Sequence, residues 1–192
     1  MIYECMNCVA EEINEFFRHK FSLQEEKVVV SGIVNQDGTL AIQGENKIVL
    51  TLLNITKEMR VQPPGMHTVA QKTIAASPPP LCFNLFVLVA AFFSASNYSE
   101  ALRFLSHTMA FLHEKKVFNT ANTPRLPDSV HKLVFEIDSM SPDRLNHVWA
   151  TLGAKYMPSL VYKVRMLIYN PVSVRGYTPA VSGIADENSE PV

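Results

Sequence analysis

The chain has 192 residues, of which 47% are hydrophobic and 18% are charged, and its formal net charge is -1. This length suits one domain with a single core. The near-neutral charge argues against nucleic-acid binding, which needs a basic patch or stripe. The odd count of 3 cysteines does not fit a disulfide framework, so we expect a reducing compartment.

The apolar segments predict neither secretion nor membrane insertion. The first residues, MIYECMNC, lack the basic start and the apolar core of a signal peptide. The most apolar run, residues 81–95, has about 15 residues, whereas a membrane-spanning helix needs roughly 20. We therefore expect a soluble protein in which this run is a buried strand.

The first part of the chain predicts one helix and two strands. Apolar side chains recur at three- and four-residue steps over residues 2–20, which indicates an amphipathic helix. β-Branched residues are frequent over 27–34 and 46–56, which predicts two strands. The sequence NQDG at 35–38 lies between them and is a turn signal.

Residues 57–80 predict a long surface loop without regular structure. This segment contains Pro63, Pro64, Pro78 and Pro79. Proline cannot donate a hydrogen bond to a sheet ladder. Structureless loops of this length are usually functional or disordered.

The middle of the chain predicts a central strand and a second helix. Residues 81–93 carry apolar side chains on both alternating sets, so both faces of this strand should be covered. The helix expected over 98–114 has one apolar stripe that should face the core. This stripe consists of Ala101, Leu102, Leu105, Met109 and Leu112.

The last part of the chain contains strong signals for a short helix. Ser141 is a typical N-cap, Pro142 suits the first helical position, and Gly153 suits the end. The elements expected here are a loop over 119–127, a strand over 131–137, the helix over 142–152, a strand over 159–169 and a tail over 170–192.

These elements predict an α+β fold. We expect a mixed, largely antiparallel sheet of about five strands with three helices. Residues 1–170 are assigned to a single domain that contains the loop at 57–80. Residues 171–192 are assigned to an extended or disordered C-terminal tail.

No catalytic, cofactor-binding or metal-binding residues are predicted. Cys5 and Cys8 form a CxxC pattern, which could be a redox pair or half of a zinc site. A redox pair should follow a strand, and a structural zinc site needs four ligands, but the sequence has no preceding strand and no second ligand pair. We interpret both cysteines as core residues of a helix. Phosphate-binding loops and nucleophile elbows are also absent from the sequence.

Several ordered blocks of the chain resemble a known family. They are VNQDG at Val34–Gly38, NLFVLVAAFF at Asn84–Phe93, YSEAL at Tyr98–Leu102 and LNHVWATLGAKYMPSLVYKVR at Leu145–Arg165. With them, roughly residues 1–170 resemble the cap, or tail-terminator, proteins of extracellular contractile injection systems. These systems are phage-tail-like particles similar to the antifeeding prophage. Cys5 and Cys8 depart from the family pattern, which argues against a role for them.

The resemblance implies a structural protein and not an enzyme. It implies a fold like that of phage tail terminators and a homohexameric ring on the distal end of the inner tube. Such a ring would stop tube growth and contact the end of the contractile sheath. The implied partners are further copies of the chain, the tube protein and the sheath protein, with no nucleic acid and no membrane. Assembly would take place in the bacterial cytoplasm, and the cap would belong to a released extracellular particle or a cell-associated injection apparatus.

Other functions remain open at this stage. The chain could be another tube-end component, a baseplate component or a sheath-docking adaptor of the same kind of particle. A small enzyme that uses Cys5 and Cys8, and a module that binds small molecules, are alternatives from other classes.

Contacts with neighbouring subunits are expected from the loop, the tail and the last strand. An extended segment can add a strand to the sheet edge of a neighbour, and its main-chain hydrogen bonds then supply affinity. The candidate contact residues are Pro63, Pro64, Pro78, Pro79, Tyr156, Tyr162, Lys163, Arg165 and Tyr177.

Overall fold

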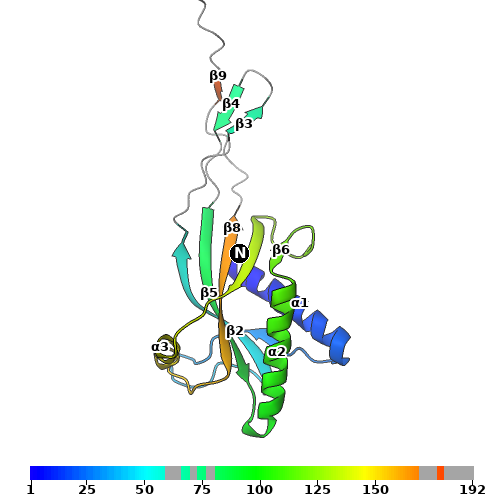
Figure 1. Cartoon of the computed structure of the whole chain (residues 1–192), viewed down its shortest axis with the longest axis vertical. Coiled ribbons are helices and arrows are strands. Elements are labelled where there is room, and N and C mark those ends of the chain that lie inside the picture. The colour runs from blue at the N-terminus through cyan, green and yellow to red at the C-terminus, as the bar shows by residue number, and fades with distance from the viewer. Residues whose placement is uncertain (59–65, 70–72, 77–80, 169–176, 180–192) are drawn as a thin grey trace, which may run out of the picture. The chain divides into compact units, whose positions relative to one another are not determined.

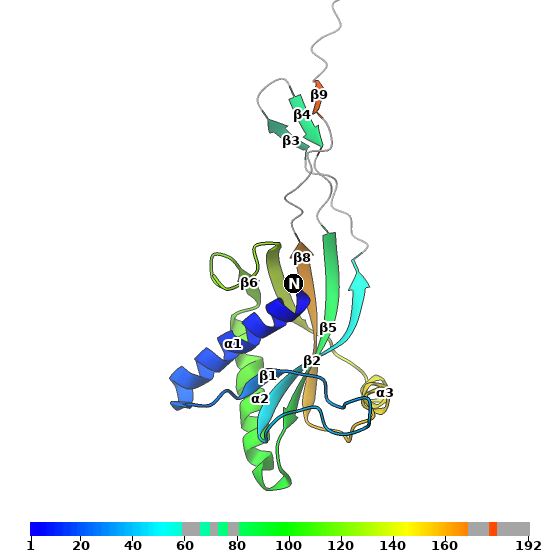
Figure 2. The same ribbon diagram turned by 180° about the vertical axis from the view of Figure 1, so that it is seen from behind.

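The computed structural model describes residues 1–58, 66–69, 73–76, 81–168 and 177–179 (Figures 1 and 2). The chain divides into two compact units. The first comprises Met1–Glu58 with Leu81–Tyr169, and the second comprises Met59–Pro80 with Asn170–Val192. The sequence suggested one domain over residues 1–170 and a tail over 171–192, and this assignment stays a prediction.

The first unit is built on a six-stranded sheet. Its strand order is β1-β2-β5-β8-β7-β6, with β1 parallel to β2 and all other neighbours antiparallel. The α+β class and the mixed, largely antiparallel sheet are therefore confirmed. The elements of this unit are α1 (Ile2–Phe21), β1 (Val28–Val30), β2 (Lys47–Lys57), β5 (Leu81–Phe92), the 3-10 turn η1 (Ala95–Asn97), α2 (Tyr98–Glu114), β6 (Val117–Asn119), β7 (Val130–Ile137), α3 (Pro142–Leu152) and β8 (Ser159–Ile168).

Hydrophobic clusters lie on both faces of the sheet. On one face, α1 and α2 cover the sheet and contribute Ile13, Phe17 and Phe104 to the larger cluster. On the other face, Trp149 of α3 and Ile33 pack against the strands. The central strand β5 supplies alternating side chains to both clusters, as the sequence predicted.

The buried face of α2 differs from the predicted stripe. Phe104 and Thr108 are buried, whereas Leu102 and Met109 are 41% and 39% exposed. The helix is thus rotated about its axis relative to the expectation. The large ring of Phe104 packs against Phe17 of α1 with ring centroids 5.1 Å apart, and this contact between helices could not be read from periodicity.

The edges of the sheet also differ from the prediction. β1 ends at Val30, shorter than the strand expected over 27–34. Beyond it, the chain leaves β2 and carries Ile33 into the cluster beside α3. A sixth strand, β6, forms at Val117–Asn119, where the sequence suggested the start of a loop, because it pairs with β7.

The second unit contains a three-stranded antiparallel sheet of β3 (Met66–Val69), β4 (Thr73–Ala76) and β9 (Tyr177–Pro179). The expectation of an irregular loop is therefore corrected over 66–69 and 73–76. The prolines on either side favoured a loop, although two short segments between them contain β-forming residues. β9 pairs with β4, a contact between residues about a hundred positions apart that local sequence signals do not report.

Candidate interaction surface

Half of strand β2 has an open edge. β1 pairs with β2 only over Ile48–Leu50. Over Leu52–Lys57, β2 is paired with β5 on one side and with no strand in the described part of the chain on the other. Such an edge presents unpaired backbone groups that can accept another strand.

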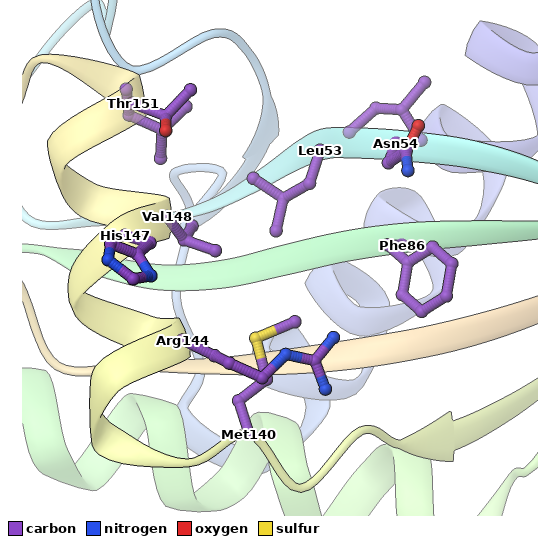
Figure 3. Close-up of a pocket in the computed structure, with 10 residues that line it drawn as sticks. Leu53, Asn54, Phe86, Met140, Arg144, His147, Val148 and Thr151 are labelled. Carbon is purple, nitrogen blue, oxygen red and sulfur yellow. The ribbon is translucent and has the colours of Figure 1, made fainter.

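A groove lies beside this open edge. It has a volume of about 410 Å³ and runs between α3 and the sheet. Figure 3 shows Arg144 and Val148 extending from α3 toward the side on which Leu53 and Phe86 lie on the strands. The complete lining is Leu52, Leu53, Asn54, Phe86, Met140, Arg144, His147, Val148, Thr151 and Leu152.

Local sequence places α3 above this groove. Ser141 caps the helix by accepting a hydrogen bond from the backbone N–H of Arg144, and Gly153 ends it with a φ of 67°. Both signals were recognised in the sequence. Trp149 packs in the core and is 3% exposed. The preceding residue, Val148, lies on a different side of the helix and lines the groove.

A cluster of polar side chains lies on the same face of the sheet as the groove. The thiol of Cys82 donates a hydrogen bond to Glu58 Oε2 at 3.0 Å. The guanidinium of Arg165 lies between two carboxylates: its Nε is 3.2 Å from Glu58 Oε2, without hydrogen-bond alignment, and its second nitrogen is 3.7 Å from Glu136 Oε1. Asn84 is 7% exposed, and its Oδ1 has no partner in the described structure.

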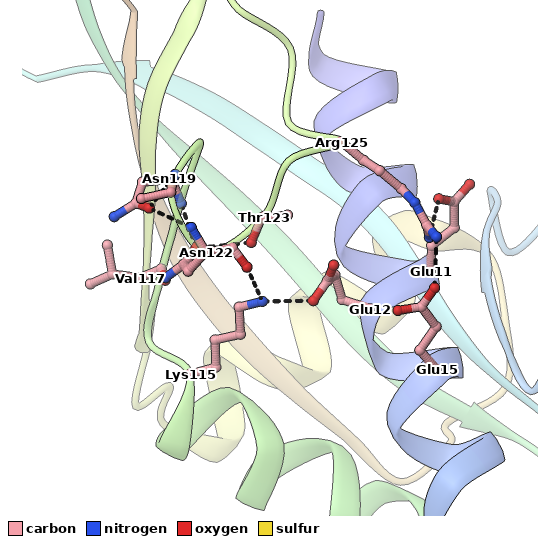
Figure 4. A network of polar contacts seen from close by, with 10 residues as sticks. Glu11, Glu12, Glu15, Lys115, Val117, Asn119, Asn122, Thr123 and Arg125 are labelled. Atoms are coloured by element: carbon pink, nitrogen blue, oxygen red, sulfur yellow. Dashed lines mark hydrogen bonds and ion pairs between the residues drawn. The ribbon is translucent and has the colours of Figure 1, made fainter.

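Ion pairs connect α1 to Lys115, which precedes β6, and to Arg125, which follows it (Figure 4). Lys115 Nζ lies 2.6 Å from Glu12 Oε2 and 3.1 Å from the carbonyl of Asn122. Arg125 lies 3.4 Å from Glu11 and 2.8 Å from Glu15. These contacts stabilise the loop that follows β6, and no catalytic arrangement results from them.

Cys5 and Cys8 are core residues, as the sequence suggested. Their side chains are 1% and 3% exposed. Burial raises the pKa of Cys5 to about 11, and burial also raises the pKa of Cys8. The thiolate form that redox and metal chemistry requires is therefore disfavoured. Across the described residues, no group of three or more His, Cys, Asp or Glu side chains is placed to hold a metal ion.

A family model decides the classification. The model described as the Pvc16 N-terminal domain matches residues 7–182. The chain belongs to this family. No curated protein matches the chain. Among the described residues of the chain, no helix has the length and apolar character needed to span a membrane.

Two of the solved structures that match the chain show the same fold. One is a sheath/tube terminator of an extracellular contractile injection system, PVC, in its extended state; it has a TM-score of 0.58 and 14% identity. The other is the tube-terminating cap of the anti-feeding prophage, with a TM-score of 0.57 and 16% identity. Both matches cover 100% of this chain, which spans 65% and 60% of the two proteins. The resemblance to tail terminators and the expected terminator-like fold are thus confirmed.

The structure places the predicted contact residues in different environments. Tyr156 is 66% exposed, and Lys163 and Arg165 are half-buried on the groove face of β8. Tyr162 is 2% exposed, because alternation along β8 turns it toward the helices, and its expected contact with a neighbouring subunit stays a prediction. Pro63, Pro64, Pro78 and Pro79 lie outside the described residues, and Tyr177 lies in β9.

The groove and the open edge of β2 were not identified from the sequence. The half-exposed apolar side chains of Leu53 and Phe86 lie in a strand-forming context, so the sequence predicts core positions for them. No local signal in the sequence reports the open edge, because it depends on where β1 stops pairing with β2.

Proposed function

We propose that this chain is the cap subunit of a contractile injection particle. In this proposal, six copies form a ring on the distal end of the inner tube, stop tube growth at a set length and contact the end of the sheath. The observation that carries the proposal is the match of the Pvc16 N-terminal domain model to residues 7–182. The fold shared with a sheath/tube terminator and a tube-terminating cap supports it.

Capping has physical requirements that the surface of this chain can meet. A growing tube exposes a binding surface for the next ring, and a cap must occupy that surface without offering a copy of it. A ring of identical head-to-tail contacts closes on itself when the rotation between subunits closes. The open edge of β2 over Leu52–Lys57 and the adjacent groove supply a surface that a neighbouring protein of the particle can cover.

The proposed partners are other copies of this chain, the tube protein and the sheath protein. The role is structural and not enzymatic. We place assembly in the bacterial cytoplasm and the finished cap on a released or cell-associated particle. Tyr156, Tyr162, Lys163 and Arg165 are the proposed contacts among residues with described side chains, and Pro63, Pro64, Pro78, Pro79 and Tyr177 are proposed contacts in the second unit.

The test is the length of particles with and without the gene, measured by electron microscopy. Loss of a cap should give long tubes of variable length or sheaths that contract early. Restoring the gene should restore a single length. Unchanged length with intact, extended sheaths would reject the cap function and favour a baseplate component or a sheath-docking adaptor.

A further inference from the structure

The open edge of β2 presents backbone groups at alternate residues. The N–H of Glu58 donates to the carbonyl of Cys82 in β5, so by alternation the N–H groups of Lys57 and Ile55 point away from β5. The N–H of Ile55 accordingly donates to the side-chain Oδ1 of Asn54, at 2.8 Å. This contact joins two neighbouring residues at an exposed position, so the carbonyl of an added strand can take the place of the amide oxygen.

The groove beside this edge combines apolar side chains with a positive charge. Leu53, Phe86 and Val148 are half-buried and line it. Arg144 and His147 also line it and are exposed, and within the described residues their side chains form no hydrogen bond or ion pair. A protein segment that fits this surface therefore needs free backbone groups for the edge and carboxylates for the guanidinium of Arg144.

One segment of this chain has that chemistry. Residues 181–190, VSGIADENSE, contain two β-branched residues and three carboxylates but no proline. They lie outside the described residues. The other segments outside the described residues do not qualify: 59–65, 77–80 and 169–176 contain proline, which cannot donate to a sheet ladder, and 70–72 has only three residues.

The length of this segment also suits the edge. A strand rises by about 3.3 Å per residue, so pairing along Leu52–Lys57 takes about 20 Å of the added strand. Residues 181–190 can supply about 33 Å when extended. The segment is therefore long enough to cover the whole open edge and still bring a carboxylate to α3.

We propose that residues 181–190 of one copy add a strand to the open edge of β2 in a neighbouring copy and place their carboxylates beside Arg144. Main-chain hydrogen bonds supply the affinity, and the charge selects the segment. The donated segment and the receiving edge are different surfaces, so each copy gives one strand and receives one, which is the head-to-tail pattern of a closed ring. This inference rests on the proposed ring and names the contact that joins its subunits.

Photo-cross-linking in particles locates the segment. Two forms of the chain are produced together: one lacks residues 181–192 and carries p-benzoylphenylalanine in place of Thr151, an exposed residue that lines the groove, and the other is intact. We expect links from position 151 to residues 181–190, which can come only from a different copy. The same probe at Ala150, on another side of α3, should not form them.

Other outcomes of the cross-linking would overturn the inference. These are links to the tube or sheath protein in place of 181–190, no links, or links to 181–190 that form only when the probe and the segment belong to one copy. The length of the same particles reports the cap function separately. Particles of normal length in which position 151 links elsewhere would reject this contact and leave the cap function standing.

Exchanging the charges tests the pairing with Arg144. Arg144→Glu, and a variant that combines Asp186→Lys, Glu187→Lys and Glu190→Lys, should each lower retention of the protein in particles by up to about fivefold. Combining the two should restore retention, because the charges have only exchanged sides. Arg18→Glu, at an exposed position on α1, should not rescue the lysine variant. Unchanged retention in the separate variants, or no recovery in the combined one, would contradict the pairing.

Discussion

The side chain of Asn14 in α1 forms two hydrogen bonds with the backbone of Val28 in β1. Its Nδ2 donates to the carbonyl of Val28 at 2.8 Å, and its Oδ1 accepts from the N–H of Val28 at 2.8 Å. The same oxygen accepts from the N–H of Lys27 at 2.9 Å. One amide thus satisfies three backbone groups of the edge strand and joins the first helix to the sheet.

Replacing Asn14 should destabilise the chain strongly. Asn14→Ala leaves three buried backbone groups without partners, and we expect a loss of about 2–4 kcal/mol in unfolding free energy. Asn7→Ala is the matched control, because Asn7 lies on the same helix and donates only to Glu11. Urea-induced unfolding measures both variants. Equal losses would show that the tether to β1 contributes little.

The ion pairs that Lys115 and Arg125 form with α1 should differ in strength. Lys115 and Glu12 are 22% and 18% exposed, so Lys115→Met should cost about 1 kcal/mol and persist in high salt. Arg125→Met should cost less, and its effect should vanish in 1 M salt, because Arg125 is 56% exposed. Unfolding curves at low and high salt make the comparison. A larger cost for Arg125 would contradict it.

Stability should fall as the pH rises above the ordinary pKa of the Cys5 thiol. Burial raises the pKa of Cys5 from 9.0 to about 11. The folded chain therefore holds the proton more tightly than the unfolded chain, and this contribution is complete below pH 9 and lost as the pH approaches 11. Unfolding free energies between pH 8 and 11 should show a shallower decline for Cys5→Ala. Identical slopes would contradict this origin of the pH dependence.

The thiols should also be unreactive in the native chain. At pH 8, the buried Cys5 and Cys8 should be alkylated only as fast as the chain unfolds. The half-buried Cys82, whose pKa burial and the Glu58 carboxylate raise to about 11, should react more slowly than a free cysteine. Mass spectrometry of time points gives the rates. Rapid modification of Cys5 would restore the redox alternative.

A charge placed in the groove should interfere with particle assembly. Val148 lies half-buried in the groove, and Ala150 lies on another side of the same helix. Val148→Glu should reduce incorporation into particles, because a carboxylate would have to be desolvated on contact with a partner. Ala150→Glu should incorporate normally. Particle content is measured after purification, and thermal unfolding of each chain confirms folding. Equal incorporation would exclude the groove as a contact.

Local signals predicted the helices and the central strand well. The first helix was expected over 2–20 and spans Ile2–Phe21, and Ser141 caps α3 as anticipated. These features depend on side-chain spacing and on backbone groups within a few residues, so they are visible in a single sequence. The same signals did not report which side of α2 is buried, because Phe104 is selected by its contact with Phe17 of another helix.

The sequence by itself determined the fold class, the order of most elements and the resemblance to tail terminators, because these depend on local pattern and on blocks of residues. Only the tertiary structure decided that β1 pairs with β2 no further than Leu50, so that one edge of β2 is open within the described part of the chain, and that Tyr162 is among the residues that line a pocket. It also paired β9 with β4. Each of these features is formed by residues that are distant in the chain, and strand pairing and packing bring them together.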